Sequence, residues 1–233
     1  MCFVNEWKWA EAEAEFRQSL KADPRCRMAL TYYGYYLTRL GRAGEAREVL
    51  NRVRQLNPES PLITKFLGHC EFLTRDYDKA LQLYLKASDL EPSYPSGRYW
   101  SGHAYLAMTN HLQALEEFRQ FELKQDRHQS WAPWLKKGLR GVLEKEGARG
   151  LWTKLLEMED ADKGDKEARP PYFCAECYAR LGDAGRALDW LEKACDQRRG
   201  GEHLLFDEFW DRFHHEPRFK EIVKKIGLES WAR

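Results

Sequence analysis

The sequence lacks any long hydrophobic run and any excess of charge of one sign. No apolar stretch approaches the ~18 residues that a membrane-spanning helix needs, so we expect no membrane partner. Residues 1–6 lack the basic region and the apolar stretch of a secretory signal peptide. The 38 lysines and arginines balance the 37 aspartates and glutamates, which argues against a nucleic acid held by a basic surface.

The sequence also has few cysteines, and the six that it has do not show the spacing of a disulfide-rich domain. Reduced thiols favour a cytoplasmic location. Cys174 and Cys177 form a CxxC pair, with His203, His214 and His215 downstream, but a tetrahedral zinc site needs two further ligands in good geometry. Alternatively, both thiols lie one turn apart on a helix and pack as small hydrophobic side chains. We predict no metal and no cofactor, and the metal interpretation of this pair stays open.

Motifs of catalytic sites are absent as well. The sequence contains no GxGxxG, no GxxxxGK[ST], no GxSxG and no HExxH. Carboxylates are abundant, but they fall on the helix faces that we expect to meet solvent. The sequence therefore predicts a protein that is not an enzyme.

What the sequence does contain is a repeat of 34 residues. Pro24, Pro58 and Pro92 are 34 positions apart (58 − 24 and 92 − 58), and further series keep the same step. These series are Gly34, Gly68 and Gly102; Ala12, Ala46, Ala80 and Ala114; and Phe16, Leu50, Tyr84 and Phe118.

Each unit of the repeat predicts a pair of amphipathic helices, for example residues 62–73 and 77–90, where apolar residues return every three or four positions. A glycine inside a helix costs roughly 1 kcal/mol relative to alanine, so glycines in phase predict a close contact between the two helices. We expect the alanine series opposite the glycines and the bulky series below them. Each proline is expected to end a second helix, and Ser60-Pro61 to begin the next unit.

These residues resemble the tetratricopeptide repeat (TPR) family, through segments such as 68–92, with Gly68, residues 77–81, Tyr84, Ala87 and Pro92. The resemblance is specific for residues 25–126 and extends to residues 7–24. The resemblance implies an all-α fold, a right-handed α-solenoid of antiparallel helix hairpins, with a C-terminal helical cap. Its array spans residues 1–126 and consists of a partial first repeat, 1–24, and whole repeats at 25–58, 59–92 and 93–126. Most or all of the first helix of the partial repeat is expected to be missing.

The rest of the chain departs from this period. Residues 127–168 predict a degenerate helix pair, 131–143 and 151–158, followed by a polar loop. Residues 169–202 predict a TPR-like repeat, and 203–233 a cap in which aromatic side chains cover the last repeat: Phe206, Phe209, Trp210 and Phe213.

The C-terminal part also resembles the TPR region of bacterial winged-helix/TPR regulators, through residues 187–194, 216–219 and 225–228. This resemblance implies a bacterial protein. It gives an alternative function, the sensor or regulatory region of a transcription regulator whose DNA-binding domain is absent from this chain.

The candidate site is the concave groove, which the first helices of stacked hairpins line. Because the glycines mark the contact between helices, residues one after and three before them, and residues one turn further, face the groove. Their mixture of aromatic, histidine and cationic side chains suits a peptide or helix with apolar anchors and acidic groups. We therefore predict a protein–protein interaction scaffold whose groove residues are Thr31, Tyr35, Arg39, Lys65, His69, Phe72, Tyr99 and His103.

Two alternatives stay open for this groove. Several of these side chains would instead pack against neighbouring repeats. RNA recognition by related helical-hairpin repeats is the second alternative, and the neutral net charge opposes it. The sequence does not predict the oligomeric state.

Overall fold

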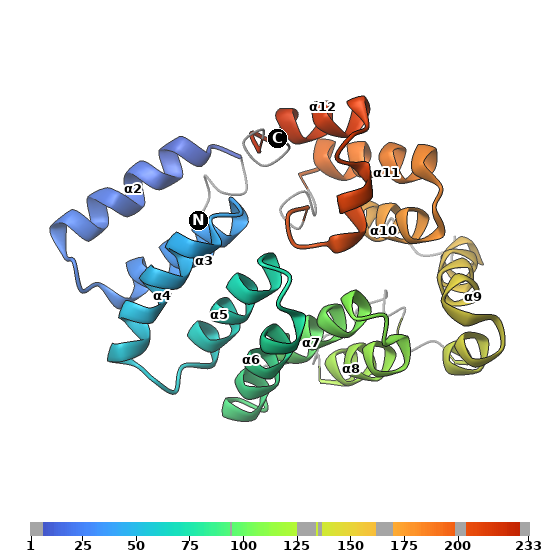
Figure 1. Ribbon diagram of the computed structural model, residues 1–233, viewed down its shortest axis with the longest axis horizontal. Helices are drawn as coiled ribbons and strands as arrows, with labels where there is room; N and C mark the ends of the chain where they lie inside the picture. The colour runs from blue at the N-terminus through green and yellow to red at the C-terminus, as the bar shows by residue number, and fades with distance from the viewer. Residues whose placement is uncertain are drawn as a thin grey trace.

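The computed structural model describes residues 7–93, 95–124, 134, 137–161, 170–198 and 204–228, without the side chains of 159–161. All regular elements in these ranges are helices, and they follow one another around an arc whose two ends meet (Figure 1). They are α2 (Trp9–Ala22), α3 (Arg27–Arg39), α4 (Ala43–Leu56), α5 (Pro61–Leu73), α6 (Tyr77–Leu90), α7 (Ser96–Ala107), α8 (His111–Leu123), α9 (Leu139–Ala161), α10 (Pro171–Leu181), α11 (Ala184–Asp196), the 3-10 helix η3 (Glu208–Phe213) and α12 (Pro217–Lys225).

The hairpins α3–α4, α5–α6 and α7–α8 form the body of the solenoid, with the first helix of each pair toward the inside of the arc (Figure 1). The predicted all-α solenoid of antiparallel hairpins is confirmed. The helices α2, α4 and α6 end two residues before Pro24, Pro58 and Pro92, where the missing N–H of proline stops a helix.

The glycine series lies at the contact within each hairpin. A Cβ atom on Gly34 would lie 2.5 Å from Leu50 Cγ, and one on Gly68 would lie 2.5 Å from Tyr84 Cε1. The third glycine, Gly102, has the same relation to Phe118, at 2.6 Å from Cε1. The predicted close approach is confirmed, but the atoms nearest to each glycine belong to the large side chain of the second helix and not to the alanine that we expected opposite it.

A further glycine joins successive hairpins. A Cβ atom on Gly97 would lie 2.6 Å from the carbonyl oxygen of Tyr84, so the start of α7 approaches the backbone of α6. Gly97 has no counterpart at 34 residues before or after it. The sequence period therefore does not reveal this contact.

Side-chain caps fix where several helices begin. Ser60 Oγ accepts a hydrogen bond from the Ile63 N–H at 3.3 Å, and Pro61 is the first residue of α5, as predicted. Asp76, Asn110 and Asp183 accept the equivalent bond at the starts of α6, α8 and α11.

The helix α9, Leu139–Ala161, is interrupted at Gly147, which has φ 69° and ψ −167°. Glycine enters this region of φ without the steric penalty that other residues pay. The break lies between the two helices predicted at 131–143 and 151–158, and the second part continues past Met158 to Ala161. Residues 131–133 and the rest of the predicted loop, 162–169, lie outside the described residues.

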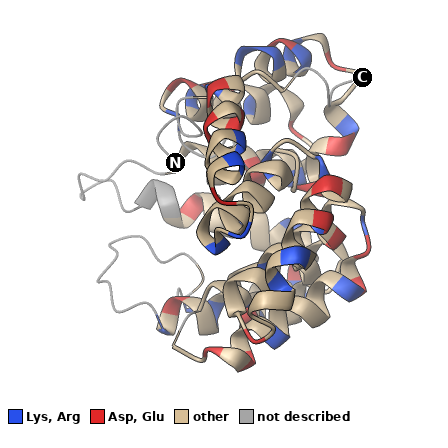
Figure 2. Cartoon of the chain, turned by 90° about the vertical axis from the view of Figure 1, so that its left-hand side faces the viewer, with Lys and Arg blue, Asp and Glu red and all other residues tan. Residues whose placement is uncertain are grey.

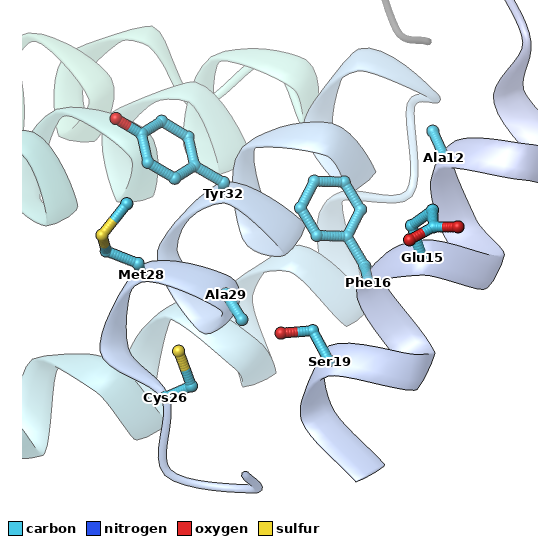
Figure 3. Close-up of a pocket in the computed structure, with 8 residues that line it drawn as sticks. All are labelled: Ala12, Glu15, Phe16, Ser19, Cys26, Met28, Ala29 and Tyr32. Carbon is cyan, nitrogen blue, oxygen red and sulfur yellow. The ribbon is translucent and has the colours of Figure 1, made fainter. Parts of the chain in front are cut away.

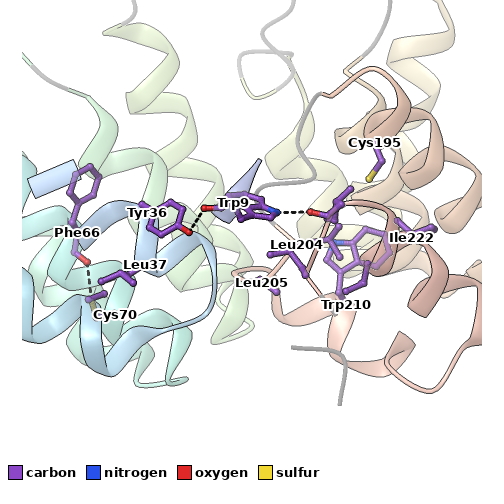
Figure 4. Close-up of a cluster of buried hydrophobic side chains, with 14 of the residues drawn as sticks. Trp9, Tyr36, Leu37, Phe66, Cys70, Cys195, Leu204, Leu205, Trp210 and Ile222 are labelled. Atoms are coloured by element: carbon purple, nitrogen blue, oxygen red, sulfur yellow. Dashed lines mark hydrogen bonds between the residues drawn. The ribbon is translucent and has the colours of Figure 1, made fainter. Parts of the chain in front are cut away.

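The C-terminal segment closes the arc against α2. Trp9 Nε1 donates a hydrogen bond to the Ile226 carbonyl oxygen at 2.6 Å, and the Tyr36 hydroxyl donates to the Trp9 carbonyl oxygen at 2.7 Å (Figure 4). Gly227 has a φ of 74°, and a Cβ atom there would lie 2.9 Å from Trp9 Cδ1. One hydrophobic cluster therefore joins α2 and α3 to the cap, including Trp210.

Among the described helices, none combines the length and the apolar character that crossing a bilayer requires. Lysine and arginine alternate with aspartate and glutamate over the side of the molecule drawn in Figure 2.

Candidate functional site: the inner face of the solenoid

The eight predicted groove residues lie on three neighbouring first helices. Tyr35 and Tyr99 are half-buried. The other six are buried, so in this structure the face that the sequence predicts as open is covered. Their positions are α3 for Thr31, Tyr35 and Arg39, α5 for Lys65, His69 and Phe72, and α7 for Tyr99 and His103.

Contacts between neighbouring repeats account for the part of this face on α3 and α5. The Tyr35 ring stacks on Phe66 with centroids 4.5 Å apart, and Arg39 donates a hydrogen bond to the Tyr35 hydroxyl. Lys65 Nζ lies 4.9 Å from the Phe66 ring and donates to Ser96 Oγ at 3.1 Å. The Tyr35–Phe66 and Lys65–Ser96 contacts tie one hairpin to the next, as the alternative interpretation proposed, whereas the other two contacts lie within one helix.

The chain's own C-terminal segment, residues 204–213, covers the part on α5 and α7. The Phe206 ring packs 5.2 Å from the His69 ring and 5.4 Å from the Trp100 ring. His69 Nδ1 in turn lies 2.9 Å from the Tyr84 hydroxyl. Arg75 holds the segment in place, because its Nη1 donates to the Phe206 carbonyl oxygen at 3.0 Å.

A buried carboxyl group follows Phe206 on this segment. Asp207 is 3% exposed, accepts a hydrogen bond from the Tyr172 hydroxyl, and has its Oδ1 3.8 Å from His103 Nδ1. Burial, together with the nearby Glu176, raises the pKa of Asp207 well above its usual range. The environment therefore shifts this carboxyl toward its neutral form relative to an exposed aspartate.

The CxxC pair lies on α10 with both thiols fully buried. Cys177 belongs to a hydrophobic cluster with Leu155 and Phe173. Within the described ranges, no group of three or more histidine, cysteine, aspartate or glutamate residues could hold a metal ion. His203 lies outside those ranges.

An open groove that the sequence did not predict lies between α2 and α3 at the start of the arc (Figure 3). Its volume is about 410 Å³, and Met28 on its edge is 70% exposed. Phe16 lines it in phase with Leu50, Tyr84 and Phe118, on which glycines of first helices pack in the whole repeats. The sequence therefore contained an indication of this groove, because Phe16 belongs to the partial first repeat, in which most or all of the first helix was expected to be missing.

Two segments of the chain match family models. Residues 7–61 match a model of the tetratricopeptide repeat, and residues 71–108 match a second model of the TPR repeat. These matches support the tetratricopeptide repeat family and agree with the 34-residue period. No curated protein matches the sequence.

Solved structures of similar fold cover nearly the whole chain. PilW, a type IV pilus biogenesis factor, aligns with a TM-score of 0.54 at 15% identity, over 96% of this chain and 94% of its own. Pseudomonas aeruginosa PilF aligns with a TM-score of 0.53 at 18% identity, over 90% and 92%. A tetratricopeptide repeat protein from Parabacteroides merdae ATCC 43184 aligns with a TM-score of 0.50 at 17% identity, over 96% and 88%.

At these identities the likeness shows the fold alone. The similarity to bacterial winged-helix/TPR regulators, and the function that it implies, stay predictions.

Proposed function

We propose that this chain is a non-catalytic scaffold that binds a segment of a partner protein on its inner face, through the eight residues predicted from the sequence. The TPR segments and the stacked hairpins support a protein partner. One observation supports binding on the inner face in particular: a polypeptide segment, residues 204–213 of the same chain, already lies on this face.

The way in which this segment packs indicates the chemistry of a partner. His69 and Trp100 meet edge to face, with centroids 4.4 Å apart, and the aromatic ring of Phe206 packs against this pair. His103 and Tyr172 lie beside the carboxyl group of Asp207. A partner segment with an aromatic residue followed by an acidic one therefore suits this face.

Binding of such a partner is coupled to release of Phe206 and Asp207, because both use the same surface. Phe206 is 1% exposed, and burying a phenylalanine side chain stabilises a fold by about 1.5–3 kcal/mol. The apparent affinity for the partner is then lower when fewer molecules have this surface uncovered. A change that loosens the segment should strengthen binding.

A synthetic peptide with the sequence of residues 204–213 tests the proposal. Arg75→Ala removes the anchor on the Phe206 carbonyl oxygen, and we expect this variant to bind the peptide more tightly than the unmodified chain in fluorescence anisotropy titrations. The titration uses the full chain. Lys65 and His103 are not substituted, because both are buried and their substitution would also change folding.

Photo-crosslinking then locates the bound peptide. A benzophenone amino acid replaces the half-buried Tyr99 on the inner face, and in a control it replaces the exposed Gln82 on α6. The proposal expects crosslinks from position 99 and none from position 82. Equal crosslinking at both positions, or no saturable binding to Arg75→Ala, would contradict it.

A further inference from the structure

A second pocket, which shares Arg212 with the segment that covers the inner face, gathers three arginines. It has a volume of about 270 Å³ and lies where the start of α8, the middle of α9, the end of α10 and the η3 helix come together. Its lining consists of His111, Ala148, Arg149, Trp152, Arg180, Leu181 and Arg212.

Arg180 lines this pocket, and several contacts hold its side chain. Its side chain is 9% exposed, its Nε donates to Glu176 Oε1 at 2.9 Å, and its Nη1 lies 3.0 Å from Glu208 Oε1. The guanidinium lies between two aromatic rings, 5.0 Å from the Trp152 centroid and 4.5 Å from the Phe209 centroid. These contacts fix the orientation of its third nitrogen.

That third nitrogen, Arg180 Nη2, is buried and has no hydrogen-bond partner within the described part of the chain. An unpaired buried donor on a charged group is costly, so it adds to the unbalanced positive charge of this pocket. The two neighbouring carboxylates, Glu176 and Glu208, are already engaged by the other nitrogens of the same guanidinium.

The other cations stand at the mouth of the pocket. Arg149 and Arg212 are exposed, and neither forms an ion pair with a carboxylate of the described residues. Burial and the charge of Arg180 both lower the pKa of Arg212. Three arginines against two glutamates leave the pocket with an excess of positive charge, and an anion would relieve it.

His111 completes the wall. Its Nδ1 lies 2.8 Å from the Thr109 carbonyl oxygen, which orients the ring. Burial lowers the pKa of this imidazole, with Arg180 adding to the effect and the Thr109 carbonyl and Glu208 opposing it. Trp152, 2% exposed, gives the pocket an apolar side next to its charged one.

We propose that this pocket binds the anionic group of a small ligand, a phosphate or a carboxylate, with Arg212 as a hydrogen-bond donor, Arg149 and Arg180 adding positive charge, and Trp152 against the ligand's apolar part. Guanidinium groups bind both kinds of anion through paired N–H donors. The volume lies just under the range of pockets for drug-sized molecules, so a small ligand fits it.

Isothermal titration calorimetry at constant ionic strength tests this site with two probes, phenyl phosphate and benzoate. We expect saturable binding of at least one probe to the full chain, and the tighter of the two identifies the anion that the pocket prefers. Arg212→Gln removes one charged donor, and we expect it to weaken binding about tenfold or more, as for other hydrogen bonds to charged groups.

Arg140→Gln on α9 is the matched control, since the Arg140 side chain is 77% exposed and pairs with Glu144. It should leave binding unchanged, and thermal melting confirms that both variants fold. Absence of saturable binding of both probes, or the same loss in Arg212→Gln and Arg140→Gln, would overturn the proposal. Arg180 itself is left intact, because its buried ion pairs belong to the fold.

Discussion

The repeat array, residues 7–124, and the C-terminal part, residues 170–228, are held together in different ways. In the array, one contact is used three times, with a glycine of the first helix packed under a large side chain of the second. The C-terminal part instead depends on a single aromatic cluster around Trp210, whose neighbours are Phe209, Phe213 and Phe219. The array can therefore tolerate one weakened contact better than the cap can.

Removing the centre of the cap should have the largest effect. Trp210 is fully buried, and replacing a buried tryptophan by alanine costs about 3–5 kcal/mol. We expect Trp210→Ala to lower the free energy of unfolding by this amount in urea titrations followed by circular dichroism. Trp190→Ala is the control, because Trp190 is only partly buried and should cost far less. Similar losses in the two variants would mean that the cap has no special role.

Overpacking one glycine contact tests the array. Gly68→Leu forces a side chain against Tyr84, which lies 2.5 Å from the position of the new Cβ atom, and such overpacking costs about 1–3 kcal/mol or more. Gly44→Leu is the matched control, since a Cβ atom there meets nothing within 4 Å. Leucine is the better helix former, so the control should be neutral or stabilised by up to about 1 kcal/mol. An unchanged melting temperature for Gly68→Leu would show that close packing of Gly68 on Tyr84 does not stabilise the fold.

The smallest effect concerns the ion pairs of the first helix. Burial raises the pKa of Glu13, but hydrogen bonds from Arg42 and Arg17 outweigh it and lower the pKa from 4.5 to about 2. The charged form is therefore favoured by folding, so its contribution is present above pH 4.5 and is lost as the pH falls toward 2. Because these side chains are partly exposed, we expect less than about 1 kcal/mol.

Unfolding free energies measured between pH 6 and pH 2.5 check this prediction. Glu13→Gln should lose part of the acid dependence, whereas the exposed Glu48→Gln should keep it. The same pH slope in Glu13→Gln and in the unmodified chain would exclude the Glu13 carboxylate as its source.

The sequence predicts the hairpins well because their contacts recur at a fixed step. Gly34, Gly68 and Gly102 each report the same local geometry, so chance agreement is small. The contact of Gly97 with α6 and the break at Gly147 occur once, and nothing in the sequence repeats them.

The candidate site was less predictable, because its contacts do not recur at a fixed step in the sequence. Periodicity indicates which face of a first helix points inward, and it placed His69 and His103 on that face. Whether that face is open depends on Phe206 and Asp207, more than 100 positions away in the chain. The arginine pocket takes its residues from four elements without a common spacing. Only the folded chain brings these groups together.

The closure of the arc on its first helix is the central claim, and the indole N–H of Trp9 reports it directly. Hydrogen exchange of tryptophan indoles by NMR, with Trp9→Phe to assign the signal, compares Trp9 with the partly buried Trp190. The buried hydrogen bond to the Ile226 carbonyl oxygen predicts exchange of the Trp9 indole that is far slower than that of Trp190. Exchange of the Trp9 indole as fast as that of Trp190 would show an open chain and contradict the account.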